Sequence, residues 1–537
     1  MKKTLLIHAD NTPNNVQKSF SHENTINFKF DNGKYANIDE YISKIIIEAL
    51  QSKDFDLIYI KDTLSSNYLE LHGLVVAYHI RLSAELEDKK RHVPIVILSD
   101  IDGYTLNKII PMAKILFTQN VYLEVNKLET VKRYDQKDIN PLTSKEYEIN
   151  FLEHVSVDAP ENSSSHSIAN EWAIHQWSNI LGTKSDAIKN NNDKISSMLY
   201  FKYIKMMHQL GDEYQREFKK VEKEGKVLLV DDKWNEGWED IVNEFVSYSY
   251  SDVKLDVLKY DYKNKTIKNI KSKVLDIVKP DYPDVLLLDL RLTEDDNSSD
   301  DDKKSISKIS GFKIIKEVQD INPGIQIIMF TASGDSLILD ELHRKGILGY
   351  IKKDAPTDKY EASKNSLKKL DTLIKKGLEK KYLKEVWIMR TKILDLDILR
   401  KDEENFIKIK AEIETIFEIL NSNLENKIKF TILTIFKVLE ILSDKFELKG
   451  SEFNKIIKLF QINNLTTYDK EISQLVCTRN FLVHSGNKDK LSSNCMKNNT
   501  LIEEPEVENI LTWFKMLQTI LVEINVEIKE RLKQNLH

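Results

Sequence analysis

The chain contains few cysteines, glycines and prolines for its 537 residues. Its two cysteines, Cys477 and Cys495, cannot build a framework of several disulfides and do not have metal-ligand spacing, so we expect a reduced, intracellular protein. Only 15 glycines and 10 prolines favour long helices over loops. Charged residues make up 31% but sum to a net charge of -6, which excludes a general attraction to nucleic acid or membrane.

Long apolar runs are also missing. No stretch of 18 uncharged apolar residues occurs, and the apolar run near the start stops at His8, too early for a signal peptide core. We therefore expect a cytoplasmic protein without a membrane partner. A chain of 537 residues exceeds what one core usually supports, so at least three domains are expected.

The pattern of apolar runs predicts a multidomain protein that combines α/β domains with an all-α region. Before residue 130, the runs KTLLIHAD, FDLIYIKD, VPIVILSD and AKILFTQN are expected strands, and NIDEYISKIIIEAL and LHGLVVAYHIRLSAEL are expected helices. The predicted parts are an α/β domain at 1–130, a helical connector at 131–224, a second α/β domain at 225–358, a linker helix at 359–398 and a helical bundle at 399–537.

Four fragments of the second α/β domain each place a polar residue after an apolar run of strand length. KVLLVDD ends in Asp231 and Asp232, DVLLLDL carries Asp289, IIMFTAS carries Thr331 and GYIKKD carries Lys353. Because the carboxyl ends of parallel strands meet at one edge of a sheet, we expect these side chains in one pocket. Carboxylates can hold a hard cation such as Mg²⁺ and can attack a phosphoryl group, while a lysine and a hydroxyl can bind its oxygens.

These fragments, in this order, resemble the receiver domain of bacterial response regulators, which has a flavodoxin-like (βα)5 fold. The resemblance implies that Asp289 accepts a phosphoryl group from a histidine kinase or a phosphotransfer protein, with Mg²⁺ as cofactor. It further implies metal ligands at Asp231, Asp232, Asp289 and the Arg291 carbonyl, residues that sense the phosphoryl group at Thr331, Lys353 and Tyr350, and a glycine, Gly311, that opens a helix. The alternative is a receiver fold kept only as a docking surface.

A long acidic insert, TEDDNSSDDDKKSISKIS at residues 293–310, replaces the usual short turn beside the phosphorylation site. It is either a solvated, disordered loop or a charged segment that repels wrong kinases or adds an outer cation site.

The first α/β domain repeats the same strand order, which indicates an internal duplication. His8 and Ala9 fall where the second domain has its acid pair, Lys61 falls at the Asp289 position and Ser99 at the Thr331 position, with Gly73 near the Gly311 position. The domain resembles a pseudo-receiver without a cation site. A slip of one residue, bringing in Asp10 and Asp62, would restore some metal binding.

Near the end of the chain, DKEISQLVCTRNFLVHSG predicts a helix in which Ile472, Leu475, Val476, Leu482 and Val483 form an apolar stripe interrupted by Arg479. Asn480 and His484 lie four residues apart on the adjoining face. An arginine and a histidine together can support RNA cleavage by its own 2′-hydroxyl, with the histidine as acid or base and the arginine binding the phosphate charge.

Arg479, Asn480 and His484 match the R-x4-6-H motif, so the region resembles the HEPN ("higher eukaryotes and prokaryotes nucleotide-binding") superfamily of helical domains. Helices expected near Asn405–Leu420, Lys427–Lys445, Tyr468–His484 and Pro505–Lys533 fit that resemblance. It implies a metal-independent ribonuclease, with RNA as substrate, completed across a homodimer and at work in stress or phage defence. The alternative is an arginine that pairs within the bundle and a histidine whose charge suits a helix C-terminus.

Together these motifs predict a response regulator in which phosphorylation of Asp289 controls a HEPN-like ribonuclease through a helix at Ser363–Leu394. The second hypothesis is a non-catalytic signalling adaptor that uses the bundle for dimerisation or partner binding. A transcription factor is disfavoured because no basic recognition helix is evident.

Overall fold

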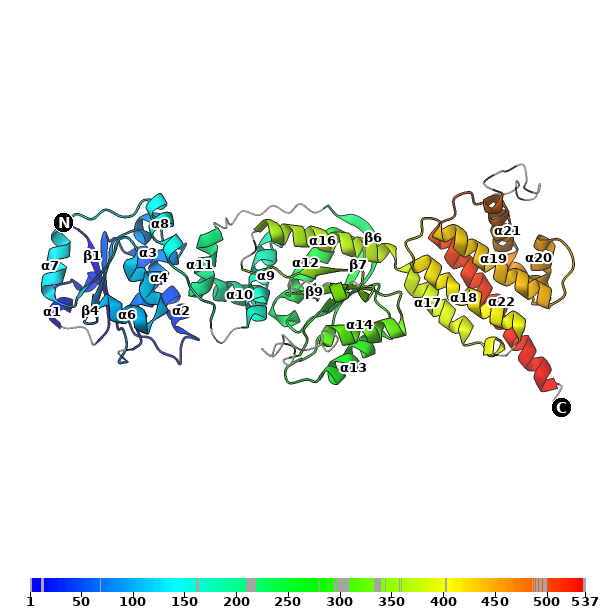
Figure 1. Cartoon of the computed structure of the whole chain (residues 1–537), viewed down its shortest axis with the longest axis horizontal. Coiled ribbons are helices and arrows are strands. Elements are labelled where there is room, and N and C mark those ends of the chain that lie inside the picture. Colours follow the sequence, from blue (N-terminus) through cyan, green and yellow to red (C-terminus); the bar gives the residue numbers. More distant parts are fainter. Residues whose placement is uncertain are drawn as a thin grey trace. The chain divides into compact units, whose positions relative to one another are not determined.

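The computed structural model describes residues 2–10, 14–67, 69–160, 164–208, 219–279, 281–293, 296, 309–332, 340–342, 344–356, 358, 360–400, 403–484, 486, 488, 491, 495 and 500–534 (Figure 1). By its contacts the chain divides into two compact units. The first comprises residues 1–218, 235–245 and 352–368, and the second comprises residues 219–234, 246–351 and 369–537. Each unit combines several of the five parts that the sequence predicts, and short pieces of the second α/β domain belong to the first unit.

The first unit contains a five-stranded parallel sheet of order β2-β1-β3-β4-β5. Its strands are β1 (Thr4–His8), β2 (Thr25–Asn27), β3 (Leu57–Lys61), β4 (Ile95–Ser99) and β5 (Val121–Val125). Three of the four expected strands are present, but the fourth expectation is wrong: AKILFTQN lies mostly in a 3₁₀ helix, η3 (Pro111–Phe117). The fifth strand is the half-exposed segment that follows it.

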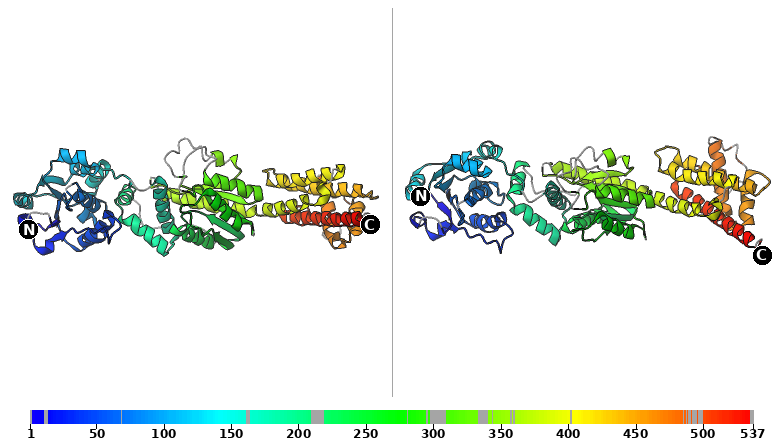
Figure 2. Two further views of the ribbon diagram at one scale, coloured as in Figure 1. Left: turned by 90° about the horizontal axis from the view of Figure 1, so that it is seen from below. Right: turned by 60° about the horizontal axis from the view of Figure 1, so that its bottom comes forward.

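Helices cover both faces of this sheet (Figure 2). Alternate strand residues point to opposite sides, so Ile58 and Ile60 of β3 join one apolar core with α4, while Leu57 and Tyr59 join a second core with α7. The expected helix at NIDEYISKIIIEAL runs continuously through α2, the π-helical η2 and α3. The helices of this domain are α1 (Asn14–Gln17), α2 (Ile38–Tyr41), η2 (Ile42–Ile47), α3 (Glu48–Ser52), α4 (His72–Leu82), α5 (Asp88–Arg91), α6 (Gly103–Ile109), α7 (Leu128–Gln136) and α8 (Ser144–Asn150).

The connector is helical, as the periodicity of its sequence suggests. It contains α9 (Ser165–Leu181), α10 (Asp186–Ser197) and α11 (Leu199–His208). Ser164 and Ser185 cap the first two helices by accepting hydrogen bonds from backbone amides three residues later. Gly182 ends α9 with a φ of 65°, a left-handed conformation that glycine adopts without a steric penalty.

The second parallel sheet has the order β10-β9-β8-β6-β7, so both sheets follow one topology: second, first, third, fourth and fifth strand. That order fits a flavodoxin-like receiver fold. The strands are β6 (Val221–Val230), β7 (Tyr250–Val257), β8 (Val285–Asp289), β9 (Gln326–Thr331) and β10 (Gly349–Lys352). The helices of this domain are α12 (Trp238–Ser249), α13 (Ile267–Val278), α14 (Ser310–Ile321) and α16 (Tyr360–Glu379).

The secondary structure of the C-terminal region, as far as its residues are described, consists of helices joined by turns and loops. The single linker helix expected over Ser363–Leu394 is instead two helices, because α16 ends at Glu379 and α17 begins at Tyr382. An additional helix, α20, lies between those expected. The helices are α17 (Tyr382–Leu394), α18 (Glu404–Asn421), α19 (Lys427–Lys445), α20 (Glu452–Ile462), α21 (Asp469–Val483) and α22 (Val507–Gln534). One apolar core joins all six.

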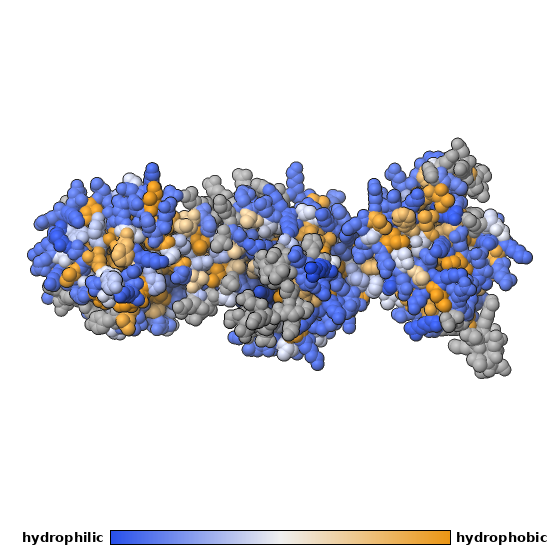
Figure 3. All heavy atoms as spheres, in the orientation of Figure 1, coloured by the Kyte–Doolittle hydropathy of each residue, from blue (hydrophilic) through white to orange (hydrophobic). Residues whose placement is uncertain are grey.

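Hydrophilic residues cover most of the face drawn in Figure 3, with apolar residues scattered between them. Across the residues that the structure describes, no helix combines the length and apolar content needed to cross a lipid bilayer.

Candidate functional site

Four predicted site residues stand at the ends of neighbouring strands of the second sheet. Asp231 directly follows β6, Asp289 is the last residue of β8, Thr331 is the last residue of β9 and Lys353 directly follows β10. The apolar residues directly before Asp231, Asp289 and Thr331 are buried in the sheet, so these three polar residues fall at the edge where the helices begin.

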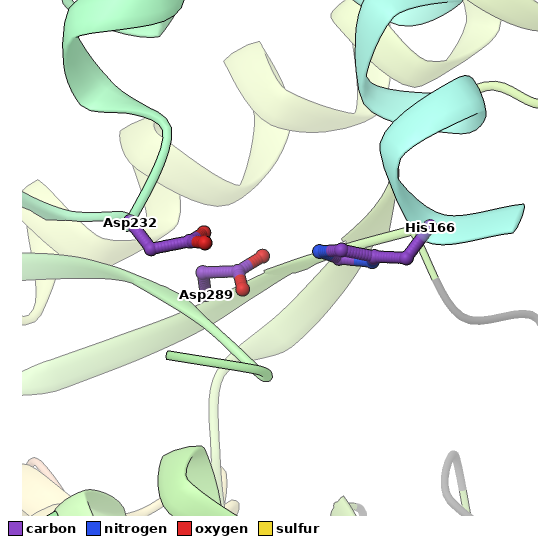
Figure 4. A group of neighbouring side chains, drawn as sticks. All are labelled: His166, Asp232 and Asp289. Carbon is purple, nitrogen blue, oxygen red and sulfur yellow. The ribbon is translucent and has the colours of Figure 1, made fainter. Parts of the chain in front are cut away.

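The acidic residues of this edge form one cluster. Oxygen atoms of Asp232 and Asp289 lie within 4.8 Å of one another, and Figure 4 shows the two carboxylates side by side. His166, also labelled in Figure 4, stands on α9 and belongs to the first compact unit. Asp231 and Asp289 are fully buried. The backbone amide of Lys233 donates to Asp231 over 2.8 Å, and that of Arg291 donates to Asp289 over 2.9 Å, so local amides orient both carboxylates.

Tyr262 belongs to the same cluster, although no sequence motif marked it. Burial raises the pKa of its hydroxyl, and the negative charges of Asp231, Asp232 and Asp289 raise it further. The hydroxyl is buried and has no hydrogen-bond partner among the described residues. Three carboxylates and an unpartnered hydroxyl in a buried pocket together favour a bound cation, since a cation would offset the repulsion between the acids.

The donor set suits Mg²⁺. This ion prefers oxygen ligands and is usually held by one or two carboxylates with several waters. Asp231, Asp232 and Asp289 offer such oxygens, whereas no cysteine lies near them in the sequence. The residues present therefore fit the predicted cofactor.

Tyr350 and the acidic insert have defined surroundings where they are described. Tyr350 is half-buried on β10, and the Lys369 ammonium lies 3.8 Å from its ring centroid. Most of the insert lies outside the described residues. Asp296 is buried rather than solvated, because its carboxylate accepts hydrogen bonds from the amide of Thr293 and from the amide and hydroxyl of Ser310 at the start of α14.

The strand registers align the two sheets residue by residue. Ile7 pairs with Ile60 in the first sheet, as Val230 pairs with Leu288 in the second. The residue after each pair is then equivalent, which places His8 at the Asp231 position and Lys61 at the Asp289 position. Ser99 and Thr331 likewise end equivalent strands.

Two glycines support the same alignment. The amide of Gly73 donates to Asp62, which follows Lys61, and the amide of Gly311 donates to Leu290, which follows Asp289. A Cβ at Gly73 would lie 2.1 Å from a backbone oxygen, and one at Gly311 would lie 2.8 Å from another. Each helix therefore needs glycine to start so close to the strand end.

A lysine and its partners replace the acid cluster in the first sheet. The Lys61 ammonium lies 2.7 Å from Asp62, and both side chains are buried. The Asp62 oxygens also accept hydrogen bonds from the Ser99 hydroxyl and the Thr63 amide, both over 2.6 Å. These donors occupy the carboxylate, which argues against the slipped register that would let Asp62 bind a metal. At the other end of the pocket, burial lowers the pKa of His8.

In the helical region, Arg479 lies half-buried near the end of α21. Its guanidinium donates to Asn480 over 2.9 Å, lies 3.8 Å from a Glu440 oxygen and lies 4.5 Å from the Phe436 ring centroid. Arg479 thus has the anionic partner that a guanidinium among apolar residues requires. Val483 is 47% exposed, so the apolar stripe ends before it, contrary to the prediction.

His484 follows α21 as its C-cap, and its amide donates to the Asn480 carbonyl. Its side chain is exposed.

Contrary to the reduced state expected from the sequence, Cys477 and Cys495 form a disulfide. The segment that this disulfide closes contains Arg479, Asn480 and His484.

Comparison with known protein families finds a match, and it lies in the domain of the first sheet. Residues 11–124 match the family described as "Inactive Receiver domain". The match runs from shortly after β1 into β5, and therefore covers most of the domain in which Lys61 stands at the position equivalent to Asp289. The pseudo-receiver prediction is confirmed in this part of the chain, and a receiver-like domain supports a role of the response-regulator type. No curated protein matches the chain.

Proposed function

We propose that the chain is a response regulator of a phosphorelay that is phosphorylated on Asp289. The observation that carries this proposal is the buried cluster at the end of β8, where Asp289 lies beside Asp232 and close to the Tyr262 hydroxyl. A pocket of acids that favours a cation is what an aspartate needs in order to receive a phosphoryl group. The N-terminal domain, with Lys61 in the acceptor position, serves as a non-phosphorylated partner-binding module.

The residues support a transfer in which one Asp289 oxygen forms a bond to phosphorus while the bond from phosphorus to the donor nitrogen breaks. The donor is a phosphohistidine of a histidine kinase or phosphotransfer protein. Asp231, Asp232, Asp289 and the Arg291 carbonyl would hold Mg²⁺, which when bound would supply positive charge for the phosphoryl oxygens. The Arg291 amide keeps the Asp289 carboxylate oriented. Lys353 and Thr331 bind the transferred phosphoryl group, and Tyr350 responds to the movement of Thr331.

For the output, we propose a HEPN-like ribonuclease in the helical region, acting as a cytoplasmic homodimer in stress or phage defence. Arg479 and His484 stand at the same end of α21, with His484 exposed to an incoming RNA strand. The histidine would take the proton from the 2′-hydroxyl while the 2′-oxygen bonds to phosphorus and the bond from phosphorus to the 5′-oxygen breaks, and the leaving 5′-oxygen would take a proton from water. Arg479 would bind the phosphate charge and Asn480 would position Arg479.

A non-catalytic adaptor is the second candidate, and one observation favours it. Arg479 is engaged by Glu440, Asn480 and Phe436, as expected for an arginine that only stabilises the bundle. Incubating the protein with a structured RNA in the presence of a chelator separates the two functions. The ribonuclease predicts cleavage that is lost in His484→Ala, whereas the adaptor predicts none in either protein.

A further inference from the structure

The first compact unit joins three segments that lie far apart in the sequence: helices α9 and α10, the start of α12, and Lys353–Asp354 after β10. Gly237, just before α12, has a φ of +133°. A Cβ there would lie 2.8 Å from Ile188 of α10 and 3.1 Å from Ile174 of α9. The two connector helices therefore pack directly on the start of α12, and the Ser185 hydroxyl adds a hydrogen bond of 2.7 Å to Asp240.

Two buried tryptophans form the centre of this contact. The Trp177 indole donates to the Asp354 carboxylate over 2.6 Å, and the Trp238 indole donates to the Asn170 side chain over 3.0 Å. The two rings meet edge to face with centroids 5.5 Å apart. Both indoles are fully buried, so each would leave an unsatisfied polar group if its partner moved away.

The same tryptophan pair reaches Lys353, the residue expected to bind the phosphoryl group. The Lys353 ammonium lies 5.0 Å from the Trp238 ring centroid, and the lysine is fully buried. The negative face of an indole ring attracts a desolvated cation placed over it. Helix α9 therefore contacts Asp354 directly and restrains Lys353 through Trp238.

The connector is attached to the inactive receiver domain at its other end. The Lys202 ammonium of α11 donates a hydrogen bond of 2.6 Å to the Ser83 hydroxyl. At the start of α11, the Leu199 amide donates a hydrogen bond of 3.0 Å to the Asp39 carboxylate. Trp172 of α9 stacks on Phe201 of α11 with the rings 8° from parallel. The connector thus contacts the inactive receiver domain through α11 and Asp354 through α9.

We propose that helices α9, α10 and α11 regulate the phosphoacceptor site by coupling the inactive receiver domain to Lys353 and Asp354. We call the arrangement described above the closed state: α9 and α10 pack on the start of α12, and the Lys353 ammonium lies over the Trp238 ring. A phosphoryl group on Asp289 competes for the same ammonium, so phosphorylation and closure oppose each other. A partner bound to the inactive receiver domain shifts the equilibrium by loosening or tightening α11. This inference rests on the proposed role of Asp289.

Binding of beryllofluoride with Mg²⁺, a mimic of the phosphoryl group, tests the coupling in the full chain. Trp177→Phe keeps the ring but removes the donor to Asp354, and we expect its half-saturating beryllofluoride concentration to fall about fivefold or more. Trp387→Phe is the matched control, because it likewise removes an indole donor, here to the Ile321 carbonyl over 2.9 Å, but lies on α17 outside the connector. Its half-saturating concentration should stay within about twofold of wild type. Ser185→Ala, a milder change at α10, should act in the same direction as Trp177→Phe.

Hydrogen exchange supplies the reciprocal measurement. Beryllofluoride should raise amide exchange in α9 of the wild-type protein while leaving the strands of the first sheet unchanged. If wild type binds beryllofluoride but Trp177→Phe and Ser185→Ala bind it with wild-type affinity, the coupling is wrong and the role of Asp289 stands. If wild type does not bind it at all, the proposed function fails and the coupling fails with it.

Discussion

Lys61 occupies in the first sheet the position that Asp289 occupies in the second. Both residues end the third strand, and the registers Ile7 to Ile60 and Val230 to Leu288 make them equivalent. At the end of the first sheet Lys61 forms an ion pair with Asp62, whereas at the end of the second sheet the carboxylates of Asp232 and Asp289 lie side by side. The first domain therefore has a lysine at this position, whereas the second keeps the aspartate that we propose to be phosphorylated.

Replacing Lys61 should destabilise the first sheet. Lys61→Ala leaves the buried Asp62 carboxylate without its ammonium partner, and we expect a loss of about 3 kcal/mol in the free energy of unfolding. Chemical denaturation followed by far-UV circular dichroism measures it. Lys3→Ala, which breaks an exposed pair with Asp54, is the control and should leave the free energy of unfolding nearly unchanged. Equal losses for the two variants would show that the internal ion pair does not hold the pocket.

Tyr262 should report on the cation. Because its buried hydroxyl has no partner among the described residues, Tyr262→Phe should stabilise the metal-free protein by about 1 kcal/mol. With Mg²⁺ the gain should shrink, since water bound to the ion can then donate a hydrogen bond to the Tyr262 hydroxyl oxygen. Thermal unfolding with and without MgCl₂ makes the comparison. A gain that does not depend on Mg²⁺ would mean that the hydroxyl takes no part in the cation site.

Protonation of His175 should destabilise the first unit in acid. Burial, aided by Lys205, lowers the pKa of His175 from 6.5 to about 4 against the opposing hydrogen bond of Asn192. A lowered pKa means that the folded state favours neutral histidine, so this stability is fully present above pH 6.5 and is lost progressively as the pH falls to about 4. The loss should reach about 3 kcal/mol and be smaller in His175→Gln. Melting curves from pH 7 to pH 4 test this, and identical pH profiles for the two proteins would contradict it.

Removing the negative charge of Glu440 beside Arg479 should raise the rate of RNA cleavage. Glu440 lies 3.8 Å from the Arg479 guanidinium and competes with an RNA phosphate for it. We expect Glu440→Gln to raise the cleavage rate about two- to fivefold, while Glu404→Gln, an exposed change on α18, leaves it unchanged. A lower rate in Glu440→Gln would show instead that Glu440 positions the arginine for catalysis.

The acid pocket could be predicted from the sequence because each of its polar residues directly follows an apolar strand. Tyr262 could not, since it stands in a segment after β7 with no strand end or motif beside it. The fifth strand of the first sheet was misplaced for a similar reason. Val121–Val125 is an edge strand with half-exposed side chains, whereas the preceding AKILF has the continuous apolar run typical of a buried strand.

The disulfide and the Arg479 pairing were beyond prediction because both depend on tertiary packing. Cys477 and Cys495 are 18 residues apart in the sequence, yet their Cα atoms lie 5.4 Å from each other, a proximity that the spacing of the two cysteines does not indicate. Glu440 lies on a different helix, so nothing in the spacing around Arg479 indicates its partner.

Phosphorylation of Asp289 is the central claim, and mass spectrometry after incubation with an acyl phosphate and Mg²⁺ tests it most directly. The wild-type chain should gain one phosphoryl group, chelation of Mg²⁺ should prevent the gain, and Lys61→Ala should still gain one. Asp289→Asn should gain none. A wild-type chain that gains no mass, or an Asp289→Asn chain that gains the same mass as wild type, would contradict the account.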